Sequence, residues 1–183
     1  AKLVDFINQA KAEAEYFETV IDALSRAETD SEISEIKAEL SSQGYLKKTA
    51  DKKKNPKALK PMRFKTRDGF TVWVGRNNLM NDRLTMKTAK NYDIWFHVQD
   101  SAGSHVICET SGAEITDEAI HDCAVLAAYY SKARASSNVA VDYTLIKNVK
   151  KPNGAKPGFV IYDPYKTEFV TPTMEETEGL RDE

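Results

Sequence analysis

The sequence predicts an α+β domain with a largely antiparallel sheet and two interposed helices, preceded by an N-terminal coiled-coil helical segment. Two observations predict this class: apolar residues recur in steps of four and three near the start, and later short segments alternate apolar and polar side chains between turns. We expect a coiled-coil helical segment at 1–43, a basic linker at 44–60, an α+β domain at 61–171 and an acidic disordered tail at 172–183.

Length and composition allow one domain with an appendage, because the chain has 183 residues of which 41% are hydrophobic. No apolar run approaches the roughly 20 residues that a membrane span needs, and no leader opens the chain, so we expect no membrane association and a cytoplasmic location. The two cysteines, Cys108 and Cys123, lack the spacing of a zinc site, and we expect no metal and no cofactor.

Charge is unevenly distributed, although the formal net charge is only −2. Residues 1–43 carry four basic and ten acidic residues, whereas residues 44–67 carry ten basic residues and one acidic residue. The lysine-rich stretch at 47–60 has no apolar periodicity and predicts a linker.

The first 27 residues predict one long helix with a coiled-coil stripe. The stripe positions are Leu3, Ile7, Ala10, Ala14, Phe17, Ile21 and Leu24. Thr29 and Glu32 have capping-box spacing, so a turn near 28–30 should lead into a second helix that ends before Gly44. Because the second helix is too short to cover the stripe, we expect a partner helix from a part of the protein outside this sequence.

The first half of the domain should contain a hairpin, a weak helix and another strand pair. Alternation predicts strands at 62–66 and 70–74, with Trp73 opposite the apolar residues of the second strand. Asn77 or Asn78 can cap a helix at about 78–89 that is weak enough to split in two. In the strand at 94–98, Trp95 and His97 should point away from the core, and a partner strand should span 104–109.

The second half should contain one longer helix and further strands. Thr116 should cap a helix at 117–134 whose small apolar stripe suits close packing on a sheet. A β-rich run at 138–146 leads to a basic loop at 147–156. A strand at 159–162 should then turn at 163–166 into a return strand at 167–170.

Basic segments interleaved with aromatic residues fit the binding of RNA, because cations neutralise phosphates and ring faces stack on bases. A hydrolytic function is the rival interpretation, since His97 and His105 lie near Asp93 and Asp100. Their spacing matches no metal-site pattern, and Ser101 and Ser104 lack the context of a nucleophile. We therefore expect a binding protein and not an enzyme.

A series of ordered motifs resembles the C-terminal NFACT-R module of the NFACT family. The motifs are Gly75-Arg76-Asn77-Asn78, Asn81-Asp82, Leu84-Thr85, Asp93, Trp95-Phe96-His97, Gly103-Ser104-His105-Val106, Val141-Asp142-Tyr143-Thr144, Lys147-Asn148-Val149-Lys150-Lys151-Pro152, Gly154-Ala155-Lys156-Pro157-Gly158, Tyr162 and Lys166-Thr167. Residues 1–46 resemble the end of the coiled coil of that family.

The resemblance implies a ribosome quality control factor of the RqcH/NEMF type. Such proteins bind obstructed large ribosomal subunits that carry peptidyl-tRNA and recruit charged tRNA for C-terminal tailing of the stalled chain, with alanine in bacteria. The expected partners are large-subunit RNA, tRNA or both, and ribosomal proteins remain a further option. Bacterial members are often labelled fibronectin- or fibrinogen-binding proteins, so a surface adhesin is the alternative function.

We expect one exposed polar face to contact RNA. Its predicted residues are Arg63, Lys65, Arg76, Asn77, Asn78, Asn81, Asp82, Trp95, His97, Ser104, His105, Lys147, Lys150, Lys151 and Lys156.

Overall fold

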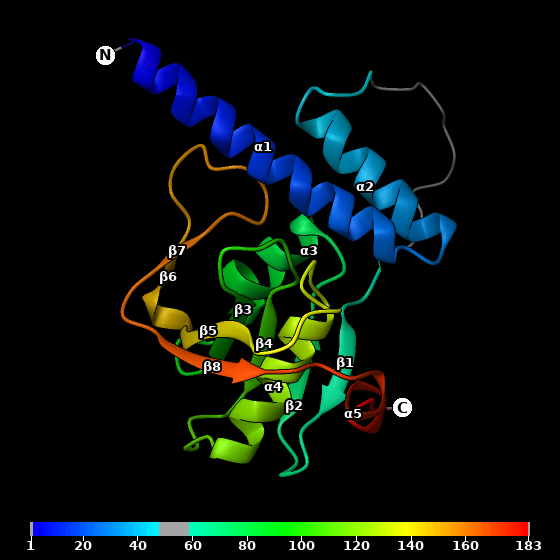
Figure 1. Ribbon diagram of the computed structural model, residues 1–183, viewed down its shortest axis with the longest axis vertical. Coiled ribbons are helices and arrows are strands. Elements are labelled where there is room, and N and C mark those ends of the chain that lie inside the picture. Colours follow the sequence, from blue (N-terminus) through cyan, green and yellow to red (C-terminus); the bar gives the residue numbers. More distant parts are fainter. Residues whose placement is uncertain (1, 48–58, 183) are drawn as a thin grey trace.

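A helical hairpin lies across one end of an α+β body in the computed structural model, which describes residues 2–47 and 59–182 (Figure 1). The hairpin consists of α1 (Lys2–Arg26) and α2 (Asp30–Ser42). Both halves of the predicted capping box form, since the Thr29 side chain accepts from the backbone of Glu32 and the Glu32 side chain accepts from that of Thr29. Gly44, with φ of 83°, follows the end of α2 as predicted. Most of the predicted linker at 44–60 lies outside the described residues.

The hairpin buries a different stripe of α1 from the predicted one. Tyr16, Val20 and Ala23 form a small core with Ile36 of α2. Most of the predicted coiled-coil stripe is exposed, and Leu3 and Ile21 are 73% and 65% exposed. Tyr16, Val20 and Ala23 also recur with helical spacing, and this second stripe packs against α2 and the body. The predicted stripe was expected to pair with a helix outside this sequence, so its coiled-coil role stays a prediction.

The body confirms the predicted α+β class. Its six-stranded sheet has the order β1-β2-β4-β3-β5-β8, and every neighbouring pair is antiparallel. The strands are β1 (Met62–Lys65), β2 (Thr71–Val74), β3 (Ile94–Val98), β4 (Val106–Glu109), β5 (Val139–Leu145) and β8 (Lys166–Val170). Ile94, Phe96 and Val98 point into the main core as predicted.

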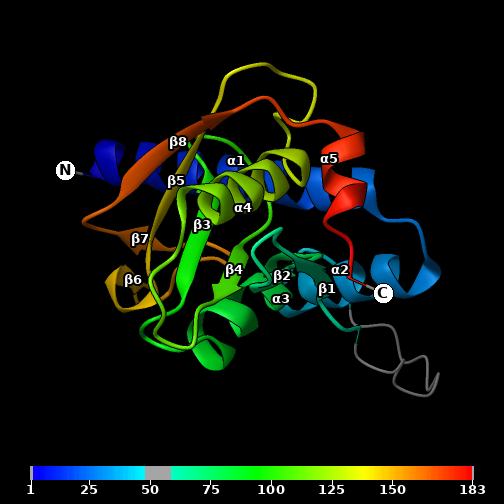
Figure 2. The ribbon, with the colours of Figure 1, turned by 90° about the horizontal axis from the view of Figure 1, so that it is seen from below.

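Helix α4 (Asp117–Tyr129) covers one face of the sheet, as Figure 2 shows. Thr116 caps it as predicted, and its buried stripe is rich in alanine. The helix ends earlier than the predicted residue 134, because the chain then follows the turn before β4: Lys132 N donates to Ala102 O at 2.8 Å. This contact places residues 102–105 beside the end of α4.

The C-terminal segment is ordered up to residue 182, which differs from the predicted disordered tail at 172–183. Thr173 caps α5 (Met174–Gly179), and Leu180 is buried in the main core. Lys65 N donates to Leu180 O at 2.8 Å, so the segment extends the edge of the sheet at β1. The acidic composition of the segment does not indicate that Leu180 is buried or that Thr173 caps a helix.

The other face of the sheet carries a second core that includes Trp95. It is covered by α3 (Asn78–Arg83), the π-helical turn η1 (Leu84–Thr88) and the 3₁₀ turn η2 (Ile146–Asn148). The change to a π turn at Leu84 agrees with the prediction that the helix at 78–89 could split. A separate two-stranded sheet joins β6 (Val149–Lys150) to β7 (Ile161–Tyr162). The predicted hairpin of 159–162 with 167–170 is therefore wrong, since β8 pairs with β5.

In the described parts of the chain, no helix is long and apolar enough to span a membrane.

Candidate nucleic-acid interface

Three consecutive residues after β2 connect the body to α2. Each donates a side-chain hydrogen bond to one of three glutamates on one face of that helix. The pairs are Arg76 Nη1 with Glu32 at 2.7 Å, Asn77 Nδ2 with Glu35 at 2.7 Å and Asn78 Nδ2 with Glu39 at 3.0 Å. The glutamates recur at intervals of three and four residues, so they share one side of α2. We call these six residues the clasp.

Glu39 lies at the most buried end of the clasp and is 1% exposed. Tyr16 Oη donates to its carboxylate at 2.9 Å, in addition to the bond from Asn78. Burial raises the pKa of Glu39 above its ordinary value, although the two hydrogen bonds act in the opposite direction. The carboxylate is therefore costly to bury, and its two donors hold α1, α2 and α3 together.

A second set of predicted RNA-binding residues forms a buried node beneath the hairpin. Ser104 Oγ donates to Gly75 O at 2.6 Å and accepts from Arg26 of α1 at 3.2 Å. Asn81 Oδ1 accepts from His105 N at 3.1 Å. A Cβ atom at Gly75 would lie 2.0 Å from Asn81 Oδ1, so only glycine allows this approach. Asn81, Ser104 and His105 are buried, which contradicts their predicted place on an exposed RNA-binding face.

Trp95 is fully buried, which contradicts its predicted role as an exposed platform for bases. It packs between neighbouring rings, stacked on His97 and tilted against Tyr162. His105 is 2% exposed, bonds to Thr85 at 2.7 Å and contacts Gly158 O at 3.0 Å. Burial lowers the pKa of both His97 and His105, so burial favours their neutral form. The alternation of β3 predicted the direction of Trp95 correctly but not the layer that covers it.

Asp82, Lys151 and Lys156 fix the loop between β6 and β7. Lys151 Nζ donates to Asp82 at 3.0 Å and to Lys156 O at 2.8 Å, and Gly158 N also donates to Asp82. Lys156 Nζ donates to the Tyr45 hydroxyl at 2.8 Å. Each of these three charged side chains therefore has a hydrogen-bond partner within the chain.

Lys147 and Lys150 are exposed as predicted, and three further cations that sequence analysis did not select, in and just after α3 and η1, are exposed as well. The five exposed cations of this surface, which we call the basic face, are Arg83, Lys87, Lys90, Lys147 and Lys150. In the described ranges, none of these side chains has an ion pair or a hydrogen bond to another side chain. Residues 83, 87 and 90 have helical spacing, a signal that could have identified them.

Backbone contacts bring the two halves of the basic face together. Lys147 N donates to Asn91 O at 3.3 Å, and Ile146 N donates to Asp93 O at 2.9 Å. Tyr92, which lies between these two acceptors in the chain, is 48% exposed. The basic face thus combines cations with an accessible aromatic ring.

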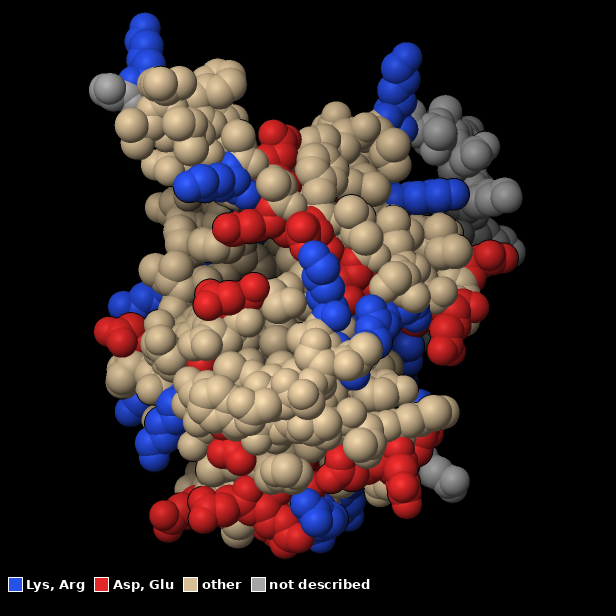
Figure 3. Space-filling model, viewed as in Figure 1, with Lys and Arg blue, Asp and Glu red and all other residues tan. Residues whose placement is uncertain are grey.

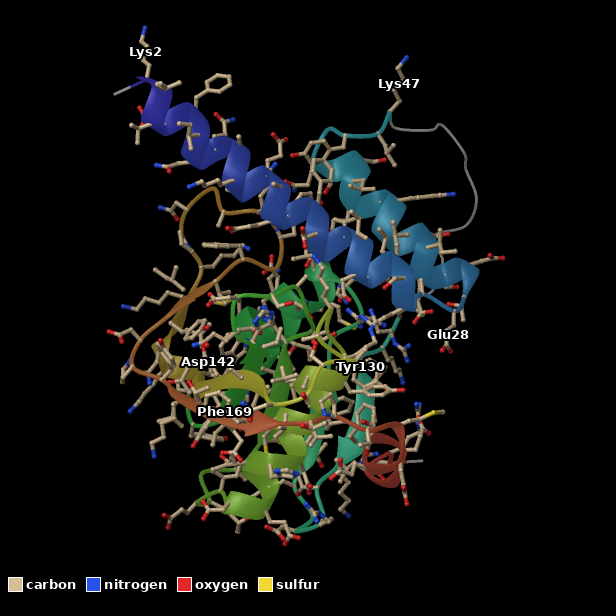
Figure 4. All side chains as sticks on the ribbon, viewed as in Figure 1. Lys2, Glu28, Lys47, Tyr130, Asp142 and Phe169 are labelled. Carbon is tan, nitrogen blue, oxygen red and sulfur yellow. The ribbon has the colours of Figure 1, made fainter. Side chains whose placement is uncertain are left out.

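The remaining predicted cations lie on β1, at one edge of the sheet. Arg63 forms an ion pair with Asp182 at 3.1 Å, whereas Lys65 is exposed. Basic and acidic side chains are intermixed on the side of the molecule in Figure 3, so charge is not gathered there into one patch. Lys2 and Lys47 extend from the far ends of the hairpin, away from the body (Figure 4).

Two family models match consecutive parts of the chain, and the boundary between the matches falls after α2. Residues 60–163 match the NFACT protein RNA binding domain, and residues 2–58 match the NFACT N-terminal and middle domains. The chain belongs to the NFACT family. The clasp therefore joins the two family segments, because its glutamates lie in the N-terminal match and its donors in the RNA binding domain.

Individual NFACT proteins cover almost the whole chain. It is 46% identical over 91% of its length to the Rqc2 homolog RqcH of Bacillus subtilis, and 44% identical over 98% to the Rqc2 homolog RqcH of Streptococcus suis. The chain spans only 29% and 32% of the length of these relatives. It also matches the structure of the C-terminal part of the fibronectin/fibrinogen-binding protein from Streptococcus suis, with a TM-score of 0.92 and 42% identity over 99% of this chain and 72% of that one.

Within the residues that the structure describes, no group of three or more His, Cys, Asp and Glu side chains is arranged to hold a metal ion.

The NFACT RNA binding domain includes the whole basic face, the buried node and the donors of the clasp.

Proposed function

We propose that this chain is the RNA-facing part of a ribosome quality control factor and that the basic face contacts RNA. The observation that carries the proposal is the presence of five exposed cations and the exposed ring of Tyr92 inside the segment that matches an NFACT RNA binding domain. Exposed cations bind phosphates by releasing counterions, and an aromatic ring stacks on an unpaired base. The relatives named Rqc2 homolog RqcH support the assignment to ribosome quality control.

The clasp serves this function by positioning the RNA-binding domain on the helical hairpin. Buried hydrogen bonds between two segments resist rotation better than an apolar contact alone, because each bond has a preferred direction. Arg76, Asn77 and Asn78 are therefore proposed to act on RNA binding indirectly.

The finer proposal is that the whole protein binds obstructed large subunits with peptidyl-tRNA in the cytoplasm and supports tRNA recruitment for C-terminal alanine tailing. Large-subunit RNA, tRNA or both would then meet the basic face. The proposed role of this chain is binding and not catalysis, which agrees with the internal hydrogen bonds of His105.

Titration of a fluorescent single-stranded RNA by fluorescence anisotropy tests the proposal. Lys87→Ala with Lys147→Ala should weaken binding and lower the slope of log K against log salt by about 0.7 for each lost phosphate contact. Lys37→Ala with Lys166→Ala removes the same charge from exposed positions elsewhere and should change binding little. Equal losses in the two double variants would refute the assignment to the basic face.

An adhesin is the second candidate, because the matched Streptococcus suis structure bears the name fibronectin/fibrinogen-binding protein. Fractionation of cells that express the full-length protein separates the two functions. Recovery with large subunits supports the RNA-binding proposal, and recovery chiefly at the cell surface supports the adhesin.

A further inference from the structure

A groove of about 990 Å³ lies between α1 and the loop that joins β6 to β7. Ala12, Glu15 and Thr19 of α1 form one wall, and residues 152–160 form the other. Trp95, His97 and Tyr162 contribute to the floor. The volume is at the upper end of the range of about 300–1,000 Å³ for small-molecule pockets, and the groove is long enough to include both the middle of α1 and the turn after β3.

Hydrogen bonds fix the loop wall of the groove to the body and to the hairpin. Lys151 and Asp82 fix the base of the loop, while Lys156 contacts Tyr45 and holds the loop to the hairpin. A Cβ atom at Gly158 would lie 2.5 Å from Asn78 Oδ1, so the loop is seated closely on the body. A wall that is already fixed loses little conformational entropy when a ligand binds.

The charge of the groove selects for a basic ligand. Its lining contains four carboxylates, those of Glu13, Glu15, Glu18 and Asp100, against one cation, Lys156. Glu18 is paired with Lys132, Glu13 accepts a hydrogen bond from the Tyr45 hydroxyl, and Lys156 lies over the Tyr45 ring at 4.8 Å. Neither Glu15 nor Asp100 has a hydrogen bond or ion pair through its side chain in the described ranges, and both are exposed.

Three residues of the lining suit an extended peptide. Asp100 lines the groove with φ of 49°, and aspartate is among the residues that tolerate this left-handed conformation. Phe159, which is 45% exposed, supplies an apolar surface for the stems of long side chains. Trp95, which lines the groove, also carries a buried donor, Nε1, that has no hydrogen-bond partner among the described residues.

We propose that this groove binds an extended peptide segment rich in lysine and arginine. Such a segment supplies cations for Glu15 and Asp100, whereas the phosphates of RNA would be repelled by the same carboxylates. The groove is distinct from the basic face in position and in charge. One molecule could therefore hold RNA on one surface and a basic protein tail on another.

The test uses a short fluorescent peptide of alternating arginine and glycine, with a matched peptide in which glutamate replaces arginine. At low salt the basic peptide should bind, and the acidic peptide should not. Glu15→Gln with Asp100→Asn should weaken binding about five- to tenfold, since each partly exposed ion pair contributes modestly. Asparagine also tolerates the backbone conformation of Asp100, so the turn is preserved.

Two controls match these changes. Glu109→Gln with Glu114→Gln removes the same charge from exposed positions outside the groove and should alter binding less than twofold. Ala12→Trp fills the groove without changing its charge and should weaken binding, whereas Ala10→Trp on the same helix lies outside the lining and should not.

Three results would overturn the proposal: no binding of the basic peptide, equal effects of groove and control variants, or dependence of RNA binding on Glu15 and Asp100. The basic-face pair Lys87→Ala with Lys147→Ala separates the two functions, because it should weaken RNA binding without weakening peptide binding. Failure of one proposal is therefore distinguishable from failure of the other.

Discussion

Asn78→Ala should destabilise the protein by removing a donor from a buried carboxylate. Asn78 Nδ2 donates to Glu39 at 3.0 Å and to Thr19 at 2.8 Å. Hydrogen bonds to charged groups contribute about 1.5–3 kcal/mol, and Glu39, which is 1% exposed, cannot recruit water easily. We expect a loss of about 2–3 kcal/mol at neutral pH, of which the bond to Glu39 accounts for most.

The stability lost in Asn78→Ala should depend on pH, because the Glu39 carboxyl is buried. Burial raises the pKa of Glu39, and removal of the bond from Asn78 should raise that pKa further. A carboxyl whose folded pKa exceeds its unfolded value stabilises the fold below the unfolded pKa, and this contribution is lost as pH rises through the folded pKa. Asn78→Ala should therefore cost less near pH 4.3, about the ordinary pKa of glutamate, than at neutral pH.

Urea unfolding, followed by the fluorescence of Trp73 and Trp95, measures these free energies. Asn91→Ala is the control, because this exposed asparagine makes no side-chain hydrogen bond within the described ranges and should change stability by less than about 0.5 kcal/mol. In the Glu39→Gln background the pH dependence of the Asn78→Ala effect should disappear. An equal cost of Asn78→Ala at both pH values, or a cost no larger than that of Asn91→Ala, would refute the reasoning.

Three further predictions concern the loop, the hairpin and the basic face. Gly158→Ala should cost about 2 kcal/mol or more in urea unfolding, because its Cβ meets Asn78 and its φ is 81°, whereas Gly154→Ala at φ of 74° with open space around it should cost only about 1 kcal/mol. Thr29→Ala should lower the unfolding free energy by about 1 kcal/mol through loss of the capping box, and an unchanged value would show that the cap is dispensable. Tyr92→Ala should weaken binding of single-stranded RNA by about 1–3 kcal/mol while Tyr92→Phe retains it, and equal binding by both variants would exclude stacking at this ring.

Local signals in the sequence predicted the fold well. The capping box at Thr29, the cap at Thr116 and the alternation of β3 depend on neighbours within a few residues, so the sequence alone determines them. The C-terminal segment was mispredicted because its order depends on Leu180 reaching the core beside β1, a contact that composition does not reveal.

The polar residues of the candidate site were harder to interpret, because burial is a property of the assembled molecule. Arg76, Asn77 and Asn78 have the residue types of an RNA-binding surface, yet their partners are glutamates about 40 positions away on α2. Trp95 likewise points away from the main core but lies under a second one. Lys147 and Lys150 are exposed as predicted, although they lie in η2 and β6 and not in the predicted loop.

The central claim is that the basic face carries RNA binding. Co-sedimentation with purified large ribosomal subunits tests this claim most directly. We predict that Lys87→Glu combined with Lys147→Glu abolishes co-sedimentation at a salt concentration where the unaltered chain is retained, whereas Lys37→Glu combined with Lys166→Glu does not. Retention of the basic-face variant together with the unaltered chain would contradict the account.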